Sequence, residues 1–394
     1  MLDTIYIGMS GLTSFSKGLS NISNNVANLN TTGFKGSDLQ FSDLYYQHQY
    51  AGSNAEYLVG LTKGSGVTAG ASATKFTQGE FRQTGNDLDA AIDGNGFFIL
   101  QSGGKLYYTR AGQFQIDGEG RLVAGSDDAA VMGLVNGAIR EINISGSRSV
   151  PAKATTEIRF ANTLSLNSPT YELTNITAID SLGSQHQLTL NFVNDTVNNP
   201  GRWTFRVLEG TTELANGSVT YNASGSPVSG SDTFSFTYAP AGALPNQLTL
   251  NFSGTTFLSS SSSSLQVSSQ NGVAAGFLTK TTIDQDGFLV LTYSNGQSVK
   301  SNQLALADFQ NLSALQSVGS NRFEIFGQTK QILSTPGSLS LGKLRVSGIE
   351  LSNVDLAREF SELIIVQRAY QASSQVISAA NEMMQQLGEI RGRR

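Results

Sequence analysis

The chain has 394 residues, carries a formal net charge of −5 and contains no cysteine. An acidic chain offers no broad basic surface for phosphates, so we expect no nucleic-acid partner. The absence of cysteine excludes disulfides and thiolate metal sites. Charged residues make up only 14% of the sequence, while glycine contributes 42 residues. This composition favours a secreted or surface β-protein over a cytosolic enzyme.

Residues 1–28 are expected to form a long amphipathic helix, because apolar side chains recur in them at spacings of three and four. Such a stripe needs a partner stripe to cover it. The stripe comprises Leu2, Ile5, Met9, Leu12, Leu19, Ile22, Val26 and Leu29. Beside it, Asn21, Asn25 and Asn28 form a polar seam. That seam is either a solvated face or a set of amides that fix the register between packed helices.

The opening residues lack the basic, apolar and small-residue regions of a cleavable secretory signal. If the protein is exported, we therefore expect it to keep its N-terminal helix. Since no run of about 18 apolar residues occurs, we expect no membrane insertion.

Residues 35–75 show no regular period, and we expect an irregular linker arm that packs through its aromatic side chains. A mobile loop is the alternative. The arm is assigned to residues 31–71 together with 345–354. Its candidate contact residues are Phe34, Phe41, Tyr45 and Tyr46.

From about residue 71 the period changes to two, which is typical of β-strands. Residues 116–123 and 283–290 share the pattern Ile-Asp-x-Glu/Asp-Gly-x-Leu-Val, and this predicts two hairpins whose Asp and Gly residues set the turn. The segment between them alternates more cleanly, as half-buried strands do. We therefore expect an inner β domain made of residues 72–149 with 276–344, and an outer β domain inserted into it, residues 150–275.

Residues 355–394 return to helical spacing and supply the second stripe. It comprises Leu356, Phe360, Leu363, Tyr370, Ile377, Ala380, Met384 and Leu387. With residues 1–30 they are expected to form a terminal helical polymerisation domain. The expected fold class is mixed and mainly β: nested β domains, with paired N- and C-terminal α-helices forming a coiled-coil-like end.

No catalytic, cofactor or metal site is predicted. Residues 93–96 and 284–287 resemble fragments of calcium loops but lack the remaining ligands, so we interpret both as turns. The two histidines, His48 and His186, have no flanking nucleophile motif. We predict that the protein is not an enzyme and has no cofactor.

Several segments near the two ends are similar to known signatures. Residues 10–12, 21–28 and 31–35, and then 352–357 and 367–371, resemble the N- and C-terminal signatures of the axial proteins of the bacterial flagellum, which comprise rod, hook and hook-associated proteins. Within that family, the length, the inserted β segment and the motifs of residues 270–309 resemble hook members. Residues 310–315 and 349–351 depart from the hook pattern, which keeps a distal-rod or other axial identity as an alternative.

The resemblance implies a structural subunit of the flagellar hook that assembles with copies of itself into a tube around a central export channel. Such a tube acts as a flexible universal joint that transmits motor torque to the filament. The further partners implied are the distal rod protein, the hook cap, the hook–filament junction protein and the flagellar type III export apparatus, and the implied location is extracellular. The alternative from a different class is a secreted β-rich adhesin or enzyme with helical ends.

Overall fold

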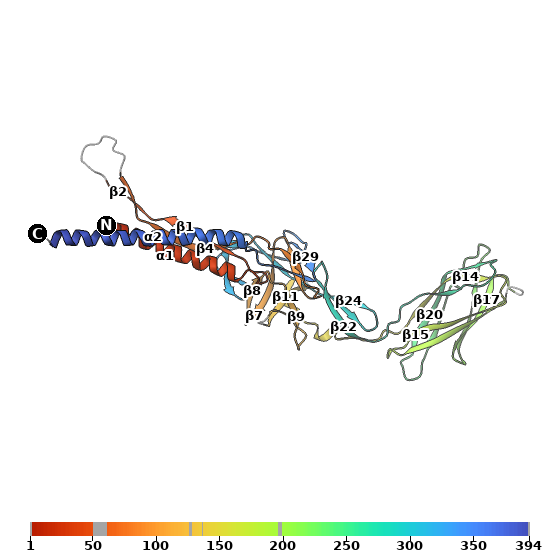
Figure 1. Ribbon diagram of the computed structural model, residues 1–394. Coiled ribbons are helices and arrows are strands. Elements are labelled where there is room, and N and C mark those ends of the chain that lie inside the picture. Colours follow the sequence, from red (N-terminus) through yellow and green to blue (C-terminus); the bar gives the residue numbers. More distant parts are fainter. Residues whose placement is uncertain (1, 50–60, 126–127, 136, 196–198, 393–394) are drawn as a thin grey trace. The chain divides into compact units, whose positions relative to one another are not determined.

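The computed structural model describes residues 2–49, 61–125, 128–135, 137–195 and 199–392 (Figure 1). The chain divides into two compact units. The first contains Met1–Ser145, Thr281–Val290 and Lys300–Arg394, and the second contains Gly146–Lys280 and Leu291–Val299.

Two antiparallel helices lie side by side in the first unit, with the two chain ends on the same side (Figure 1). They are α1 (Leu2–Ala27) and α2 (Leu356–Gly392). Asp355 caps α2, because its Oδ1 accepts hydrogen bonds from the backbone N–H groups of Ala357 at 2.9 Å and Arg358 at 3.3 Å. A side-chain oxygen at this position satisfies amide donors that have no partner inside the helix.

The described residues 37–49 and 61–74 form a β-ribbon, so the expectation of an irregular arm is wrong for them, while residues 50–60 lie outside the described residues. β1 (Ser37–Asp43) pairs antiparallel with β4 (Val67–Thr74), and β2 (Tyr46–Gln49) pairs with β3 (Leu61–Gly64). The paired strands lie far apart in the sequence and β4 consists mostly of small residues. A short window therefore contains neither the pairing partner nor a strong apolar alternation.

The β part of the first unit combines strands from before and after the second unit. β8 pairs with β27, β7 with β25, β6 with β29 and β5 with β30. The early strands are β5 (Phe81–Gln83), β6 (Ala90–Asp93), β7 (Phe97–Ser102), β8 (Lys105–Thr109), β9 (Phe114–Ile116), β10 (Leu122–Ala124), β11 (Ala129–Val135) and β12 (Ala138–Glu141). The late strands are β25 (Leu306–Phe309), β26 (Leu315–Gly319), β27 (Arg322–Ile325), β28 (Gln331–Ser334), β29 (Lys343–Val346) and β30 (Gly348–Glu350). One core cluster, which includes Phe97, Tyr108, Phe309 and Phe323, draws on both groups.

The second unit contains two four-stranded sheets, ordered β19-β20-β14-β21 and β15-β16-β17-β18. Its strands are β13 (Ser149–Val150), β14 (Glu157–Ser165), β15 (Thr170–Ile179), β16 (Gln185–Asn194), β17 (Arg202–Glu209), β18 (Thr212–Thr220), β19 (Thr233–Tyr238), β20 (Asn246–Leu258) and β21 (Gln266–Gln270). Alternate residues of these strands form one core around Trp203, Phe205 and Phe252, as the period of two predicts. The division between the units falls within β22 (Gly276–Ile283), β23 (Phe288–Tyr293) and β24 (Ser298–Leu304).

Both repeated Asp-Gly segments are turns, as predicted. The Asp117 Oδ1 accepts from the N–H of Glu119 at 2.9 Å, and the Asp284 Oδ1 accepts from the N–H of Asp286 at 3.0 Å. Each carboxylate thus organises its own turn. The fold class is confirmed: the molecule is mainly β, with several β domains and paired terminal helices.

Candidate functional site: the paired terminal helices and their anchor

The two helices approach each other along glycines of α1. A Cβ atom on Gly8 would lie 2.6 Å from Ile377 Cγ1, and one on Gly11 would lie 2.8 Å from Ser373 Oγ. Atoms that close would overlap, so a side chain at either position would force Ile377 or Ser373 to move from the arrangement observed here. We call Gly8, Gly11 and Gly18 the glycine seam.

The register of the pair is antiparallel and regular. It is defined by four pairs of facing residues: Gly8 with Ile377, Gly11 with Ser373, Gly18 with Val366, and Asn25 with Glu359. By this register α1 begins level with Glu382. Residues 383–392 of α2 consequently have no counterpart among the described residues of α1.

Asn25 fixes one end of this register. Its buried Nδ2 donates to both carboxylate oxygens of Glu359 at 3.2 Å and to the Ser37 carbonyl at 2.9 Å. Burial raises the pKa of the Glu359 carboxyl, while the Asn25 hydrogen bond opposes that rise. Of the two interpretations of the polar seam, the structure supports register fixing at Asn25. The side-chain amide of Asn21 donates to the same Ser37 carbonyl at 2.6 Å.

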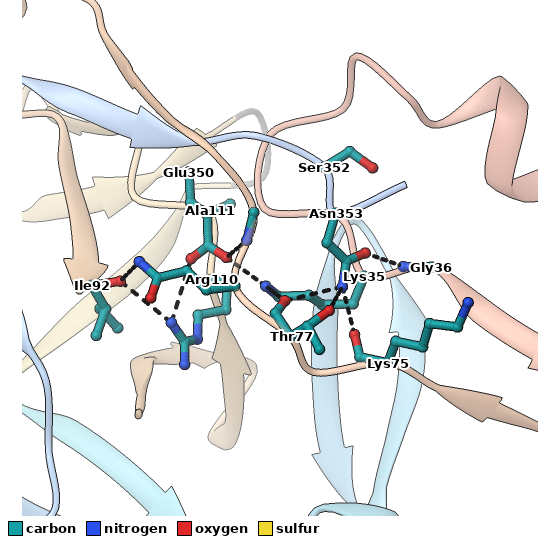
Figure 2. Close-up of polar contacts among 12 residues, drawn as sticks. Lys35, Gly36, Lys75, Thr77, Ile92, Arg110, Ala111, Glu350, Ser352 and Asn353 are labelled. Atoms are coloured by element: carbon teal, nitrogen blue, oxygen red, sulfur yellow. Dashed lines mark hydrogen bonds and ion pairs between the residues drawn. The ribbon is translucent and has the colours of Figure 1, made fainter. Parts of the chain in front are cut away.

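A buried ion cluster connects the helical segments to the β domain (Figure 2). It contains Lys35, which follows α1, Glu350, which precedes α2, and Arg110, which follows β8. Lys35 Nζ pairs with Glu350 Oε1, and Arg110 Nη1 lies 3.4 Å from Glu350 Oε2. Burial lowers the pKa of Lys35 and of Arg110, and the Glu350 carboxylate opposes both shifts. One carboxylate therefore pairs with two buried cations, and the Asp308 carboxylate also favours the charged form of Arg110.

Asn353 lies beside this ion cluster. We call Lys35, Arg110, Glu350 and Asn353 the anchor. Its Oδ1 accepts from the Gly36 N–H at 2.8 Å, and its Nδ2 donates to the carbonyls of Lys75 at 2.8 Å and Thr77 at 3.0 Å (Figure 2). The Thr77 carbonyl also accepts from Lys35 Nζ at 2.8 Å. The segments after α1, before β5 and before α2 are thus held at one point.

The predicted N-terminal stripe and the face that meets α2 only partly coincide. Ile22 is buried, and Ile5, Leu12, Leu19, Val26 and Leu29 are half-buried. Met9 is exposed, and the side chain of Leu2 lies outside the described residues. Ser14, which the apolar pattern passed over, is buried beside β4, where its Oγ donates to the Val67 carbonyl at 3.2 Å.

The C-terminal stripe is divided in the same way. Ala380 is buried, and Leu363 and Ile377 are half-buried. Leu356, Phe360, Tyr370 and Met384 are exposed. The side chain of Leu387 lies outside the described residues.

Among the predicted arm residues, Phe41 packs on α1. Its ring centroid lies 5.7 Å from that of Phe15, and a Cβ on Gly18 would lie 3.2 Å from its Cζ. Phe34 is half-buried and Tyr45 is exposed, while the side chain of Tyr46 lies outside the described residues.

Sequence reasoning missed the glycine seam and the ion cluster. Glycine counts as a weak helix former, yet three glycines on one face would have indicated a close helix contact. The ion cluster left no local signal, because Lys35 and Glu350 are 315 residues apart.

The described residues include no group of His, Cys, Asp or Glu placed to hold a metal ion. None of the described helices has the length and apolar character needed to cross a membrane. The site is therefore a contact surface. It consists of a close helix pair with apolar side chains on its outer faces, and buried charges attach it to the β domain.

Comparison with known families covers most of the chain. Residues 5–35 match the family described as flagella basal body rod protein, and residues 91–160 match the flagellar hook protein FlgE/F/G D1 domain. Residues 143–273 match the flagellar basal body protein FlaE D2 domain, and residues 347–390 match the flagellar basal body rod FlgEFG protein C-terminal.

Curated relatives align with the chain from end to end. It is 30% identical to the flagellar hook protein FlgE of Treponema pallidum (strain Nichols), with 98% of each chain covered. It is also 30% identical to the FlgE of Escherichia coli (strain K12), covering 97% of this chain and 98% of that one. The chain belongs to the flagellar hook protein family. It is therefore a structural subunit of the bacterial flagellar hook, and the family is not enzymatic.

Among solved structures, the chain is similar to the Helicobacter pylori flagellar hook protein FlgE2. The TM-score is 0.47 and the identity 13%, with 67% of this chain and 99% of that chain covered. In this hook-family chain, the two terminal family matches contain the glycine seam and Asn353.

Proposed function

We propose that this hook subunit polymerises through its paired terminal helices into a tube with a central export channel. The observation that carries the proposal is the amount of apolar surface that the helix pair leaves uncovered. Tyr6 is 71% exposed and Ile365 is 66% exposed. The other large apolar side chains exposed on the two helices are Ile7, Met9, Leu356, Phe360, Ile364, Tyr370, Val376, Met383 and Met384.

Exposed apolar side chains at this density indicate an interaction surface. Complete burial of one such side chain contributes roughly 1.5–3 kcal/mol. Because these residues are already partly covered, we expect about half of that from each. The glycine seam brings α1 and α2 together within a subunit, and the outward apolar residues then remain for neighbouring copies. Residues 383–392, which extend beyond α1, add a further surface for them.

Family membership supports the finer parts of the proposal. The tube would act as a flexible universal joint that carries motor torque to the filament. Its further partners would be the distal rod protein, the hook cap, the hook–filament junction protein and the type III export apparatus.

The domain assignment follows the same scheme. We assign residues 1–30 and 355–394 to the polymerisation domain, 31–71 and 345–354 to the arm, 72–149 and 276–344 to the tube wall, and 150–275 to the outer surface. In this assignment the ion cluster joins the arm, through Lys35 and Glu350, to the wall, through Arg110.

A substitution on α2 tests the proposal. Ile365→Asp places a charge on the outer face of the helix pair, so we expect the critical concentration for polymerisation to rise at least tenfold in sedimentation assays. Phe326→Asp is the matched control, because Phe326 is 78% exposed but lies on the β part of the first unit. Normal assembly of Ile365→Asp, with the fold verified by circular dichroism, would refute the role of the helices.

Electron microscopy of the assembled protein tests the hook assignment itself. Curved tubes with a central channel are the expected result. Straight rods would favour the distal-rod alternative.

A further inference from the structure

A histidine in the second unit lies between two carboxylates. His186, near the start of β16, has its Nδ1 2.7 Å from Glu209 Oε1 and its Nε2 3.1 Å from Asp180 Oδ2. A neutral imidazole has one N–H and would present a lone pair to one of these carboxylates. Both contacts are favourable only when the ring carries two protons, so the arrangement calls for an imidazolium.

The groups facing the ring come from three elements. Asp180 belongs to the turn between β15 and β16, Glu209 is the last residue of β17, and Tyr238 of β19 meets the ring edge-on at 5.9 Å. The two carboxylates lie at opposite ring nitrogens, so a single metal ion could not bind the imidazole and both acids. The geometry suits a doubly protonated ring rather than one metal ion shared by all three side chains.

Asp180 also organises the turn to which it belongs. Its Oδ1 accepts from the N–H groups of Leu182 at 2.8 Å and Ser184 at 2.9 Å. In the same turn Gly183 has φ of +92°, and a Cβ there would lie 3.0 Å from Ala152 Cβ and 3.1 Å from the Ala275 nitrogen. The turn therefore packs on the two segments through which the chain enters and leaves the main part of the second unit.

We propose that His186, Asp180 and Glu209 form a proton-dependent clamp that holds the 180–184 turn against these two segments. Burial lowers the pKa of His186, but hydrogen bonds to Asp180 and Glu209 outweigh it, so that the pKa is raised overall. A raised pKa gives stability that is fully present below the unfolded value of about 6.5 and is lost as the pH rises through the folded value. The clamp is thus closed in mildly acidic solution and loosens in alkaline solution.

Imidazole NMR on the full-length chain in its unassembled form tests the protonation. His48 is the only other histidine, so a His48→Asn background isolates the His186 signal. We expect its titration midpoint above about 6.5, and we expect Glu209→Gln to move it down because one carboxylate charge is lost. A midpoint at or below that value, or no change in Glu209→Gln, would overturn the proposal.

Proteolysis tests whether the 180–184 turn is held less firmly when His186 loses a proton. Leu182 is 67% exposed and provides a chymotrypsin site in the turn, while Phe326, 78% exposed in the first unit, provides an internal reference for the pH dependence of the protease. We expect cleavage at Leu182 relative to Phe326 to increase several-fold from pH 6 to pH 9. In His186→Gln the ratio should be high at both pH values. A ratio that does not change with pH in the unmodified chain would show that no clamp exists.

Discussion

At the scale of single residues, Glu350 is the centre of the anchor. It accepts from Lys35 Nζ and from the Gly79 N–H at 2.9 Å, and it faces the guanidinium of Arg110. Desolvation makes an unpaired buried charge expensive, whereas a paired and hydrogen-bonded charge is tolerated. The same carboxylate pairs with two cations from different parts of the chain, so its loss removes both ion pairs at once.

Replacing Glu350 by Gln should destabilise the first unit strongly. The substitution keeps the shape but leaves Lys35 and Arg110 without their carboxylate, and we expect a loss of about 3–5 kcal/mol in the free energy of unfolding. The control is Glu362→Gln, which removes an exposed i,i+4 pair with Arg358 and should cost less than about 0.5 kcal/mol. Equal effects in urea unfolding would contradict the anchor.

The raised pKa of Glu359 should make the stability of the helix pair depend on pH. Its raised pKa comes first from burial, and the nearby Glu362 and Asp38 add to it. The stability gained by protonation is therefore complete below the unfolded pKa of about 4.3 and disappears as the pH rises through the folded value.

In Glu359→Gln this titration is absent while one acceptor for Asn25 remains. The unfolding free energy of the variant, measured relative to the unmodified chain, should rise between pH 4 and pH 7. Other carboxylates titrate in both proteins and cancel in the difference. A difference that is constant or falls over this range would show that burial does not control Glu359.

At the scale of elements, the contact between α1 and α2 depends on the absence of side chains. Leucine at Gly8 would enter the space of Ile377, and overpacking of this kind costs about 1–3 kcal/mol or more. This outweighs the gain in helix propensity of about 1 kcal/mol. We therefore expect Gly8→Leu to lower the helicity of the assembled protein and to weaken assembly.

Gly388→Leu is the matched control, because a Cβ at Gly388 meets no other atom within 4 Å. The same change of residue in the same kind of helix should then preserve or raise helicity. Circular dichroism compares the helicity of the two variants. Sedimentation is read for Gly8→Leu alone, because Gly388 lies in the surface that we propose for neighbouring copies. If Gly8→Leu behaved like Gly388→Leu, the close approach of the helices would not be required.

At the scale of the whole molecule, the second unit is inserted at neighbouring points of the chain. Val150 pairs with Gly276 in the antiparallel register of β13 and β22. Adjacent ends allow a domain to be inserted without strain in the host. Removing it should be tolerated for the same reason.

A chain in which residues 151–275 are replaced by Asn-Gly should fold, because this dipeptide favours the two-residue turn that joins antiparallel strands. We expect cooperative thermal unfolding and retention of assembly, since both terminal helices remain. Near-ultraviolet circular dichroism and sedimentation provide the measurements. Loss of fixed tertiary structure would show that the first unit depends on the second for its folding.

Hydrophobic spacing and turn motifs predicted the correct helices, hairpins and strands wherever the pattern arises from neighbouring residues. The helical spacing located α1 and α2, the Asp-Gly turns located two hairpins, and the alternation around Trp203 located the core of the second unit. The β1–β4 ribbon was missed, because its partner strand lies outside any short window and its residues carry little apolar contrast.

The sequence by itself determined the helical ends, the β middle and the resemblance to flagellar axial proteins, because periodicity and local motifs are properties of neighbouring residues. Only the tertiary structure decided which face of α1 meets α2. An apolar pattern gives weight to large side chains, whereas the closest backbone contact occurs where side chains are missing. The tertiary structure also decided the partners of Lys35, Asn25 and Asn353, because these buried polar groups form hydrogen bonds with residues far away in the chain.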